Sequence, residues 1–398
     1  MFNFFIAIYS LAAIIYNSGY ALITVGENFS YIFVPLAMYN VYYLILKKRI
    51  IRHKITLSSF IFLLMILMIF LSIVINNNMG LYAPYFRFLM VIVNAYAITF
   101  RYTISQFWEK FKFLFITISV ISLIAYLFFV LLNVTCFLPK VINNNGVMYY
   151  NGLIYFAMIN DMERNIGVFW EPGIFASFIV IMLLLDPIVE KKIDKKFSLL
   201  MLVTLFTTKS TAGILLIPLI FIVIISEFKV NNLKKTLNYL IVSIVSIFFI
   251  GYTDIIGNIF NSNSQLFGKI VNKSGSVVTR MNGPVLDLKI FLFSPLLGNG
   301  YYKYFNYWST MSHEYNLLAR TSTLTFFPAV YGISGFLYFY AVANGVYKLR
   351  YINKFVNLLV LLVFIFILSK EPHQNNMLMF ILIFYMLNEN CIKKGKYD

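Results

Sequence analysis

The feature that most constrains this chain is the recurrence of apolar runs of about 20 residues, the length that a helix needs to cross a hydrocarbon core of roughly 30 Å. These runs follow one another along the 398 residues, of which 61% are hydrophobic and only 12% are charged. They leave no room for a water-soluble domain. The sequence therefore predicts an all-α polytopic membrane protein, with residues 1–398 forming a single integral membrane domain.

The formal net charge of +17 has a topological explanation, because the basic residues gather at the ends of apolar runs as the positive-inside rule requires. This pattern makes nucleic acid an unlikely partner. Clusters that we assign to the cytoplasm begin at Lys47, Arg101, Lys191, Lys229, Lys348 and Lys393. About twelve transmembrane helices with both termini in the cytoplasm satisfy every cluster. The segment from about Phe2 to Val25 lacks the pattern of a cleaved signal peptide and is interpreted as a retained first helix.

Two long polar interruptions, residues 135–170 and 254–320, are predicted to be extracytoplasmic loops. The two cysteines, Cys136 and Cys391, fall on opposite sides in this topology and cannot form a disulfide. The predicted spans are about 2–25, 31–46, 55–75, 85–100, 113–134 and 171–190, then a short hairpin, then about 236–252 and three further spans.

The hairpin lies between the basic clusters that end at Lys196 and begin at Lys229, which are only about 30 residues apart. Two helices of about 15 residues each rise only about 22 Å. The tip, residues 207–213, should therefore stay below the outer surface. A lysine at that depth is tolerated only in a wet or protein-lined cavity, so Lys209 is predicted at the floor of an outward-open cavity.

Polar residues on the outer face carry most information about function, because topology already explains the cytoplasmic charge. Arg164 either reaches up to lipid headgroups or binds phosphate oxygens, for which guanidinium is well suited. Glu171, which precedes Pro172, either caps a helix or handles a proton. His313 is either a solvated loop residue or a general base, a role that histidine takes more often than other residues. The other candidates are Lys209, Lys273, Arg280, Lys303, Glu314, Arg320, Lys370, Glu371 and His373.

Motifs for cofactors are absent. The sequence has no phosphate-binding loop, no zinc-binding cluster and no HExxH, and Gly298-Asn299-Gly300 is a loop turn rather than a dinucleotide fingerprint. The acidic pair Asp161 and Glu163 is too nonspecific to indicate a metal ion. We expect neither a metal nor a cofactor.

The stretch from Arg164 to Ala176, which reads R-N-I-G-V-F-W-E-P-G-I-F-A, resembles the loop-to-helix entry of Wzy-type polysaccharide repeat-unit polymerases, relatives of the O-antigen ligases. Further features follow in the family's order. They are Lys209-Ser210 at the hairpin tip, Arg280 before an apolar run that ends in Gly298-Asn-Gly300, and His313-Glu-Tyr-Asn316 before Tyr331-Gly332. Lys209 stands where relatives usually have Arg, and Glu314 where they often have Asn. By motif, the resemblance covers about residues 161–340.

The resemblance implies a GT-C-like, inverting, metal-independent glycosyltransferase in the bacterial inner membrane with its active site facing the periplasm. It would polymerise undecaprenyl-diphosphate-linked repeat units into O-antigen, capsule or exopolysaccharide, in contact with membrane lipid and with a chain-length regulator as a candidate partner. Of the residues that match, His313 would be the base or would orient the acceptor hydroxyl, and Glu171 is the second choice. The diphosphate ligands would be Arg164, Arg280 and Lys209, with Lys273 and Arg320 as weaker candidates.

Other functions remain open from the sequence. A lipid-linked oligosaccharide flippase would also have about twelve helices and a basic cavity, although transporters often contain two related halves with paired broken helices, and only one broken hairpin is visible here. An O-antigen ligase would differ only in its acceptor. A purely structural membrane scaffold would not need a submerged lysine.

Overall fold

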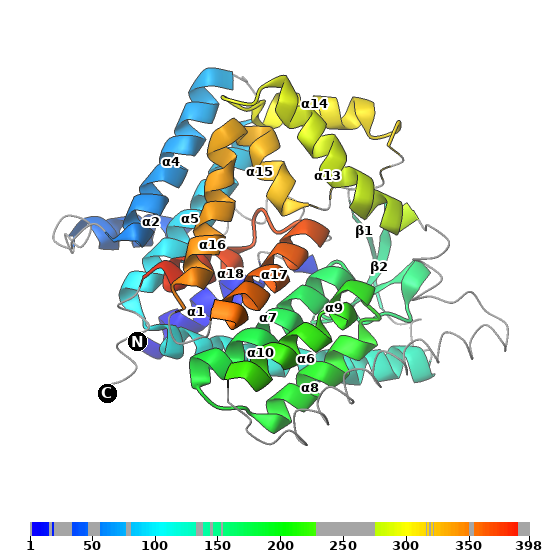
Figure 1. The fold of residues 1–398 in the computed structure, drawn as a ribbon. Coiled ribbons are helices and arrows are strands. Elements are labelled where there is room, and N and C mark those ends of the chain that lie inside the picture. Colours follow the sequence, from blue (N-terminus) through cyan, green and yellow to red (C-terminus); the bar gives the residue numbers. More distant parts are fainter. Residues whose placement is uncertain are drawn as a thin grey trace. The chain divides into compact units, whose positions relative to one another are not determined.

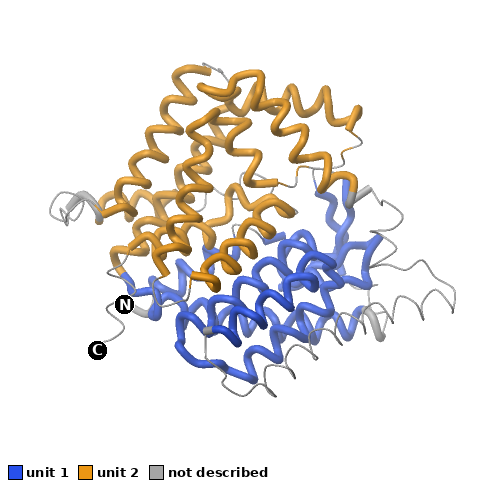
Figure 2. The backbone as a smooth tube through the Cα atoms, in the orientation of Figure 1, with its two compact units in different colours: residues 1–32, 102–252 blue, residues 33–101, 253–398 orange. Residues whose placement is uncertain are grey.

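The computed structural model is mostly helical and falls into two compact units (Figure 2). Unit 1 combines residues 1–32 with 102–252, and unit 2 combines residues 33–101 with 253–398. The structure describes residues 2–15, 18–19, 34–46, 56–76, 81–132, 138–143, 146–152, 154–227, 275–315, 317, 320, 322–349 and 354–388.

The two units have different contents (Figure 1). Unit 1 contains α1 (Phe2–Ile15), α6 (Ile104–Leu132), β1 (Lys140–Ile142), β2 (Met148–Asn151), β3 (Phe156–Met158), η3 (Ile159–Asp161), α7 (Pro172–Glu190), α8 (Lys195–Thr207), α9 (Thr211–Leu215) and α10 (Ile217–Glu227). Unit 2 contains α2 (Val34–Leu46), α4 (Leu57–Asn76), α5 (Tyr82–Arg101), α13 (Gly275–Phe293), α14 (Gly300–Met311), α15 (Thr323–Tyr331), η4 (Gly332–Gly335), α16 (Phe336–Tyr347), α17 (Lys354–Lys370) and α18 (Met377–Leu387).

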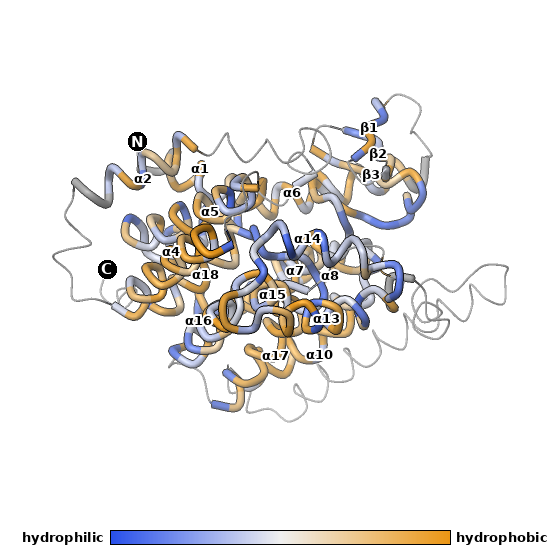
Figure 3. The backbone as a smooth tube through the Cα atoms, turned by 90° about the horizontal axis from the view of Figure 1, so that it is seen from above, coloured by the Kyte–Doolittle hydropathy of each residue, from blue (hydrophilic) through white to orange (hydrophobic). Residues whose placement is uncertain are grey.

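Several helices are long and apolar enough to cross a bilayer, and hydrophobic residues predominate along α4, α15 and α18 (Figure 3). Among the described residues, five segments have this length and composition: Leu57–Asn76, Tyr82–Arg101, Ile104–Phe129, Pro172–Glu190 and Thr323–Tyr347. The chain therefore has the helices of a membrane protein, as its apolar runs predict. The predicted span at 236–252 lies outside the described residues.

The α6 helix begins at Ile104, earlier than the predicted start near residue 113, and so includes several charged residues. Two of its side chains contact the carboxylate of Asp186 on α7. Trp108 Nε1 donates to Asp186 Oδ1 at 2.9 Å, and Lys112 Nζ lies 2.9 Å from Asp186 Oδ2. Lys112 also contacts Asp194, which caps α8 by accepting from the backbone N–H of Phe197. These partners allow the helix to continue through a stretch that hydropathy alone excludes.

The core of unit 1 is organised around α7, which contacts α6, α8, α9 and α10. All its residues from Pro172 to Pro187 are buried, as expected for a helix that is apolar on every side. In unit 2, α18 is similarly buried along its whole length and packs on α4, α5 and α16.

The structure differs from the predicted all-α fold, because β1, β2 and β3 form a three-stranded antiparallel sheet in the order β1-β2-β3. Tyr149 pairs with Val141 on one side and with Met158 on the other. Tyr149 and Phe156 pack with Ile166 into a small core beside Trp170. Gly146, which lies between β1 and β2, has φ of 77°, a left-handed conformation that glycine adopts without strain.

The stretch predicted as the main outer loop, 254–320, contains two helices in its described part, α13 and α14. The α13 helix packs on α14, α15 and α17, and α14 also contacts α4. The α14 helix is fixed at its first turn, where the backbone N–H of Tyr301 donates to the Tyr85 hydroxyl at 3.2 Å. A side chain at Gly300, which has φ of 63°, would meet Asn76 and Tyr85.

Candidate functional site

In unit 1, the loop between η3 and α7 is fixed by a buried side chain that the sequence analysis did not single out. Asn165 Nδ2 donates to Thr207 Oγ1 at 3.0 Å, and its Oδ1 accepts from the backbone N–H of Gly167 at 3.0 Å. Its own backbone N–H donates to the Thr207 carbonyl. Gly167 has φ of 58°, and a Cβ there would come within 3.1 Å of the Phe175 ring. Asn165 therefore joins the loop to the end of α8.

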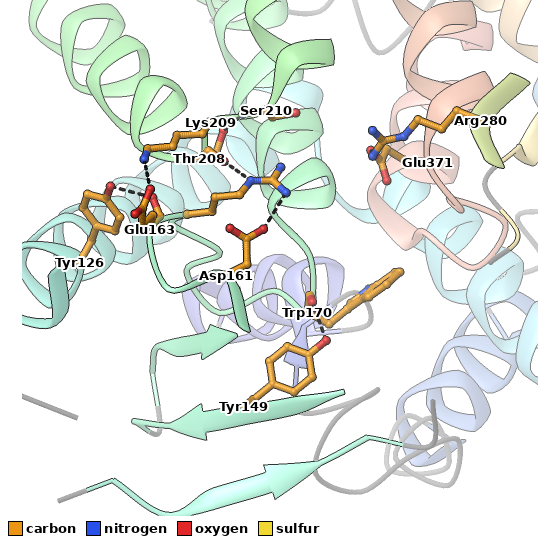
Figure 4. Close-up of polar contacts among 11 residues, drawn as sticks. Tyr126, Tyr149, Asp161, Glu163, Trp170, Thr208, Lys209, Ser210, Arg280 and Glu371 are labelled. Carbon is orange, nitrogen blue, oxygen red and sulfur yellow. Dashed lines mark hydrogen bonds and ion pairs between the residues drawn. The ribbon is translucent and has the colours of Figure 1, made fainter. Parts of the chain in front are cut away.

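The loop places Arg164 against the tip of the α8–α9 hairpin. Its Nε donates to the Thr208 carbonyl at 3.2 Å, and its Nη1 lies 3.1 Å from Asp161 Oδ2 (Figure 4). These two contacts orient the planar guanidinium from different sides. Arg164 and the hairpin tip, which are far apart in the sequence, therefore lie side by side.

Lys209 occupies the turn between α8 and α9 and has a left-handed backbone, with φ of 47°. This conformation follows the C-cap Thr208, a position where glycine is normally preferred because a side chain costs roughly 1 kcal/mol. The next residue, Ser210, caps α9 by accepting from the backbone N–H of Gly213. Lys209 Nζ lies 2.8 Å from Glu163 Oε2. The hairpin thus presents a lysine from a strained position beside the Arg164 loop.

The acidic residues of this cluster match its cations in number. Asp161 pairs with Arg164, and Glu163 pairs with Lys209, so the four formal charges sum to zero. The Glu163 side chain is 60% exposed, and its backbone carbonyl accepts from the Tyr126 hydroxyl at 2.9 Å. An exposed pair of this kind contributes at most about 1 kcal/mol. A multivalent anion could therefore displace the Glu163 carboxylate from Lys209 at little cost.

Glu171 occupies the N-cap position of α7, with Pro172 at the first helical position. Glu171 therefore stands at the predicted cap position, but its side chain makes no capping hydrogen bond. The Tyr149 hydroxyl donates to the carbonyl of the preceding residue, Trp170, at 3.1 Å. Burial, and to a smaller extent the Glu171 carboxylate, raises the pKa of the Tyr149 hydroxyl. It therefore stays protonated and fixes the entry to α7.

In unit 2, Arg280 on α13 is paired with Glu371, which follows α17. The distance from Arg280 Nη2 to Glu371 Oε1 is 3.0 Å. The Glu371 side chain is only 3% exposed, while that of Arg280 is 22% exposed. The Glu371 carbonyl accepts from Thr323 Oγ1 on α15 at 2.9 Å. Glu371 is therefore fixed through its backbone by Thr323 and through its carboxylate by Arg280.

The turn after Glu371 contains a buried histidine, His373. Asn376 caps α18 with Oδ1, which accepts from two backbone N–H groups, so its Nδ2 faces His373 Nδ1 at 2.9 Å and must donate. His373 Nδ1 is then the acceptor, and the ring proton lies on Nε2. Burial lowers the pKa of His373 to about 3. The side chain is therefore neutral and suits a structural role in the turn.

The remaining predicted residues of unit 2 lie around α14. His313 lies exposed in the turn that follows α14. The Arg320 guanidinium lies 4.5 Å from the centroid of the Phe305 ring and 5.8 Å from that of Phe326. Lys273 lies outside the described residues.

The structure brings together Arg164 and Lys209, and it places Glu171 on the same loop in unit 1. Arg280, His313 and Arg320 belong to unit 2. The contacts of Asn165 and Glu371 give both residues positioning roles that the sequence does not predict. Asn165 lies inside the stretch that begins at Arg164, and Glu371 is a candidate from the sequence without an assigned role. In comparisons with known proteins, the chain matches no protein-family model and no curated protein.

Proposed function

We propose that this chain is a membrane glycosyltransferase that polymerises undecaprenyl-diphosphate-linked repeat units on the outer face of the bacterial inner membrane. The proposal includes about twelve transmembrane helices in a GT-C-like arrangement, cytoplasmic termini and a submerged α8–α9 hairpin. The observation that carries it is the juxtaposition of Arg164 and Lys209 in unit 1. Both residues belong to the motifs that resemble Wzy-type polymerases.

In the proposed reaction, the hydroxyl at the non-reducing end of an incoming repeat unit attacks the anomeric carbon of the growing glycan. The bond from that carbon to the diphosphate oxygen breaks, and undecaprenyl diphosphate leaves. Direct displacement inverts the anomeric configuration. The acceptor hydroxyl gives its proton to a base, for which His313 is the first candidate and Glu171 the second.

The main task of the protein in this chemistry is to position the acceptor and to stabilise the charge on the leaving diphosphate. Arg164 offers planar donors that match phosphate oxygens, and Lys209 supplies a mobile point charge. The exposed Glu163 would be displaced as the diphosphate arrives. Arg280 and Arg320 are the candidates of unit 2, and Lys273 is a further candidate from the sequence.

The test is polymer synthesis by the purified protein, with defined lipid-linked repeat units and four variants: Arg164→Ala, Lys209→Ala, Arg280→Ala and His313→Ala. The proposal expects a polymer ladder from the unaltered protein and a loss of at least tenfold in each variant. Lys192→Ala is the matched control, because its side chain is 71% exposed and it belongs to a basic cluster that we assign to the cytoplasm. Lipid scrambling in vesicles without polymer would instead indicate a flippase, and transfer only to a lipid A core acceptor would indicate a ligase.

A further inference from the structure

One face of the α13 helix exposes large apolar residues. Met281, Val285, Leu288 and Leu292 follow the spacing i, i+4, i+7 and i+11, which places them on one face of a helix. Their exposed fractions are 65%, 52%, 46% and 70%. A water-facing helix would carry polar residues on such a face.

The opposite face of α13 buries polar groups. Both carboxylate oxygens of Asp287 are bonded: Oδ1 accepts from the Tyr304 hydroxyl and Oδ2 from Thr325 Oγ1, each at 2.7 Å. Thr279 is also buried, and Arg280 pairs with the buried Glu371. The helix therefore buries Asp287 and Thr279 beside the apolar Leu286 and Ile290. Its exposed side is nevertheless largely apolar, which is unusual for a helix that faces water.

The exposed apolar surface continues into the turn between α13 and α14. Leu296 is 71% exposed and Leu297 is 54% exposed. The turn is held against η4, because the backbone N–H of Ile333 donates to the Pro295 carbonyl at 2.7 Å. A side chain at Gly298, which has φ of 74°, would meet the backbone of residues 330–332. These apolar side chains are thus displayed by a fixed turn.

The same surface is continuous with a helix that is long enough to cross a membrane. The α13 helix packs on α15, which together with α16 forms the candidate span Thr323–Tyr347. Phe291 contacts Phe336 at 5.8 Å between ring centroids, and Phe336 is itself 45% exposed. Large apolar patches mark an interaction surface, and here the neighbouring surface is that of a membrane span.

One charged residue, Lys289, lies exposed beside the apolar face. Its Nζ is 5.5 Å from the centroid of the Tyr315 ring, in the turn that follows α14. A long side chain of this kind can rest its carbon chain on apolar surface while its ammonium reaches a polar region. Lys289 is therefore compatible with a bilayer on this side of the helix.

We propose that α13 and the following turn are embedded in the lipid bilayer, with Met281, Val285, Leu288, Leu292 and Leu296 against acyl chains. Part of the stretch predicted as an aqueous outer loop would then be membrane-embedded protein. The occupant of this surface is bilayer lipid, chosen because the surface continues onto a membrane-length helix. The inference does not depend on the proposed glycosyltransferase activity.

The test is site-directed spin labelling of the full chain in phospholipid bilayers. Single cysteines replace Val285, Leu288, Leu292 or Leu296 in a background with Cys136→Ser and Cys391→Ser. Each nitroxide is examined for collisions with oxygen, which concentrates in hydrocarbon, and with a water-soluble nickel complex. Asn306→Cys on the exposed face of α14 is the matched control. Variants are compared only if they keep the thermal midpoint of the background protein in detergent.

The proposal expects oxygen collisions to exceed nickel collisions by severalfold at all four α13 and turn positions, and the reverse at position 306. Nickel access at positions 288 and 292 equal to that at 306 would overturn it. Low access to both reagents, together with dipolar broadening between labels, would show that a second copy of the chain covers this face, and would also overturn it. The variant Leu292→Ser, which carries no label, gives a second measurement in bilayers: a lower thermal midpoint than that of the unaltered protein supports lipid contact, and an unchanged midpoint contradicts it.

Discussion

Two ion pairs, Lys209–Glu163 in unit 1 and Arg280–Glu371 in unit 2, differ in how far water reaches them. In unit 1, Lys209 pairs with Glu163, whose side chain is 60% exposed, on a loop beside a strained turn. In unit 2, Arg280 pairs with Glu371, whose side chain is 3% exposed. An exposed pair exchanges partners cheaply, whereas breaking a buried pair leaves an uncompensated charge. We therefore interpret the Lys209–Glu163 pair as the one able to exchange its carboxylate for a ligand, and the Arg280–Glu371 pair as one that fixes Arg280.

The largest expected effect is on stability, at Glu371. Glu371→Ala should lower the free energy of unfolding by about 3 kcal/mol, because it leaves Arg280 beside an emptied carboxylate position. Glu163→Ala is the matched change in unit 1 and should alter stability by less than about 0.5 kcal/mol. Thermal unfolding in detergent measures both. Equal losses of stability in the two variants would contradict the proposed difference between the Arg280–Glu371 pair and the Lys209–Glu163 pair.

The next effect is on activity, at Arg164. Arg164→Ala should lower the rate of polymer formation about 100-fold, which corresponds to about 2.7 kcal/mol of transition-state stabilisation. Arg164→Lys keeps the charge but not the planar donors and should recover part of the rate. Initial rates with lipid-linked repeat units test this. An unchanged rate in Arg164→Ala at normal protein level would exclude Arg164 from the diphosphate site.

Substitutions at Lys209 can change activity and stability in opposite directions, because the lysine has a left-handed backbone. Lys209→Gly should leave stability unchanged or raise it by up to about 1 kcal/mol, since glycine adopts this conformation without strain. The same variant should lose polymer formation by about tenfold, while Lys209→Arg should retain most of it. Unfolding midpoints and initial rates are measured on the same samples. A fall in stability of Lys209→Gly that parallels the loss of rate would indicate a structural lysine.

The smallest effect that we expect is a gain in substrate affinity, on replacement of Glu163. Glu163→Gln removes the carboxylate that competes for Lys209, so the apparent affinity for the lipid-linked substrate should rise by up to about fivefold, equivalent to about 1 kcal/mol. The KM for the repeat unit reports this directly. Asp161→Asn is a useful companion, because it removes the other carboxylate of the cluster from Arg164. A higher KM in Glu163→Gln would show that Glu163 helps to bind substrate instead of competing with it.

Much of the helical architecture follows from the sequence, because long apolar runs have few alternatives to membrane-length helices. The early start of α6 did not follow, since Lys112 looks like an interface charge until Asp186 is found beside it. The sheet was missed because its strands have only three or four residues. The outward apolar face of α13 was hidden by Arg280 and Asp287, whose buried partners lie far along the chain.

The sequence identifies the cations of the candidate site but not the contacts that hold them. The stretch beginning at Arg164 and the hairpin carrying Lys209 stand out as polar residues in an apolar chain, so sequence alone selects them. Their carboxylate partners and the backbone strain at Lys209 depend on the folded loop. Asn165 could not be distinguished from other loop asparagines without its contacts to Thr207 and Gly167.

The proposed activity is the synthesis of polysaccharide from lipid-linked repeat units. The most direct measurement is the product profile of the purified protein in detergent, given defined undecaprenyl-diphosphate repeat units and no other protein. We expect a ladder of polymers with inverted anomeric linkages from the unaltered chain, and little or no polymer from Arg164→Ala. Absence of polymer from well-folded, unaltered protein, with scrambling of the same lipids in vesicles, would contradict it.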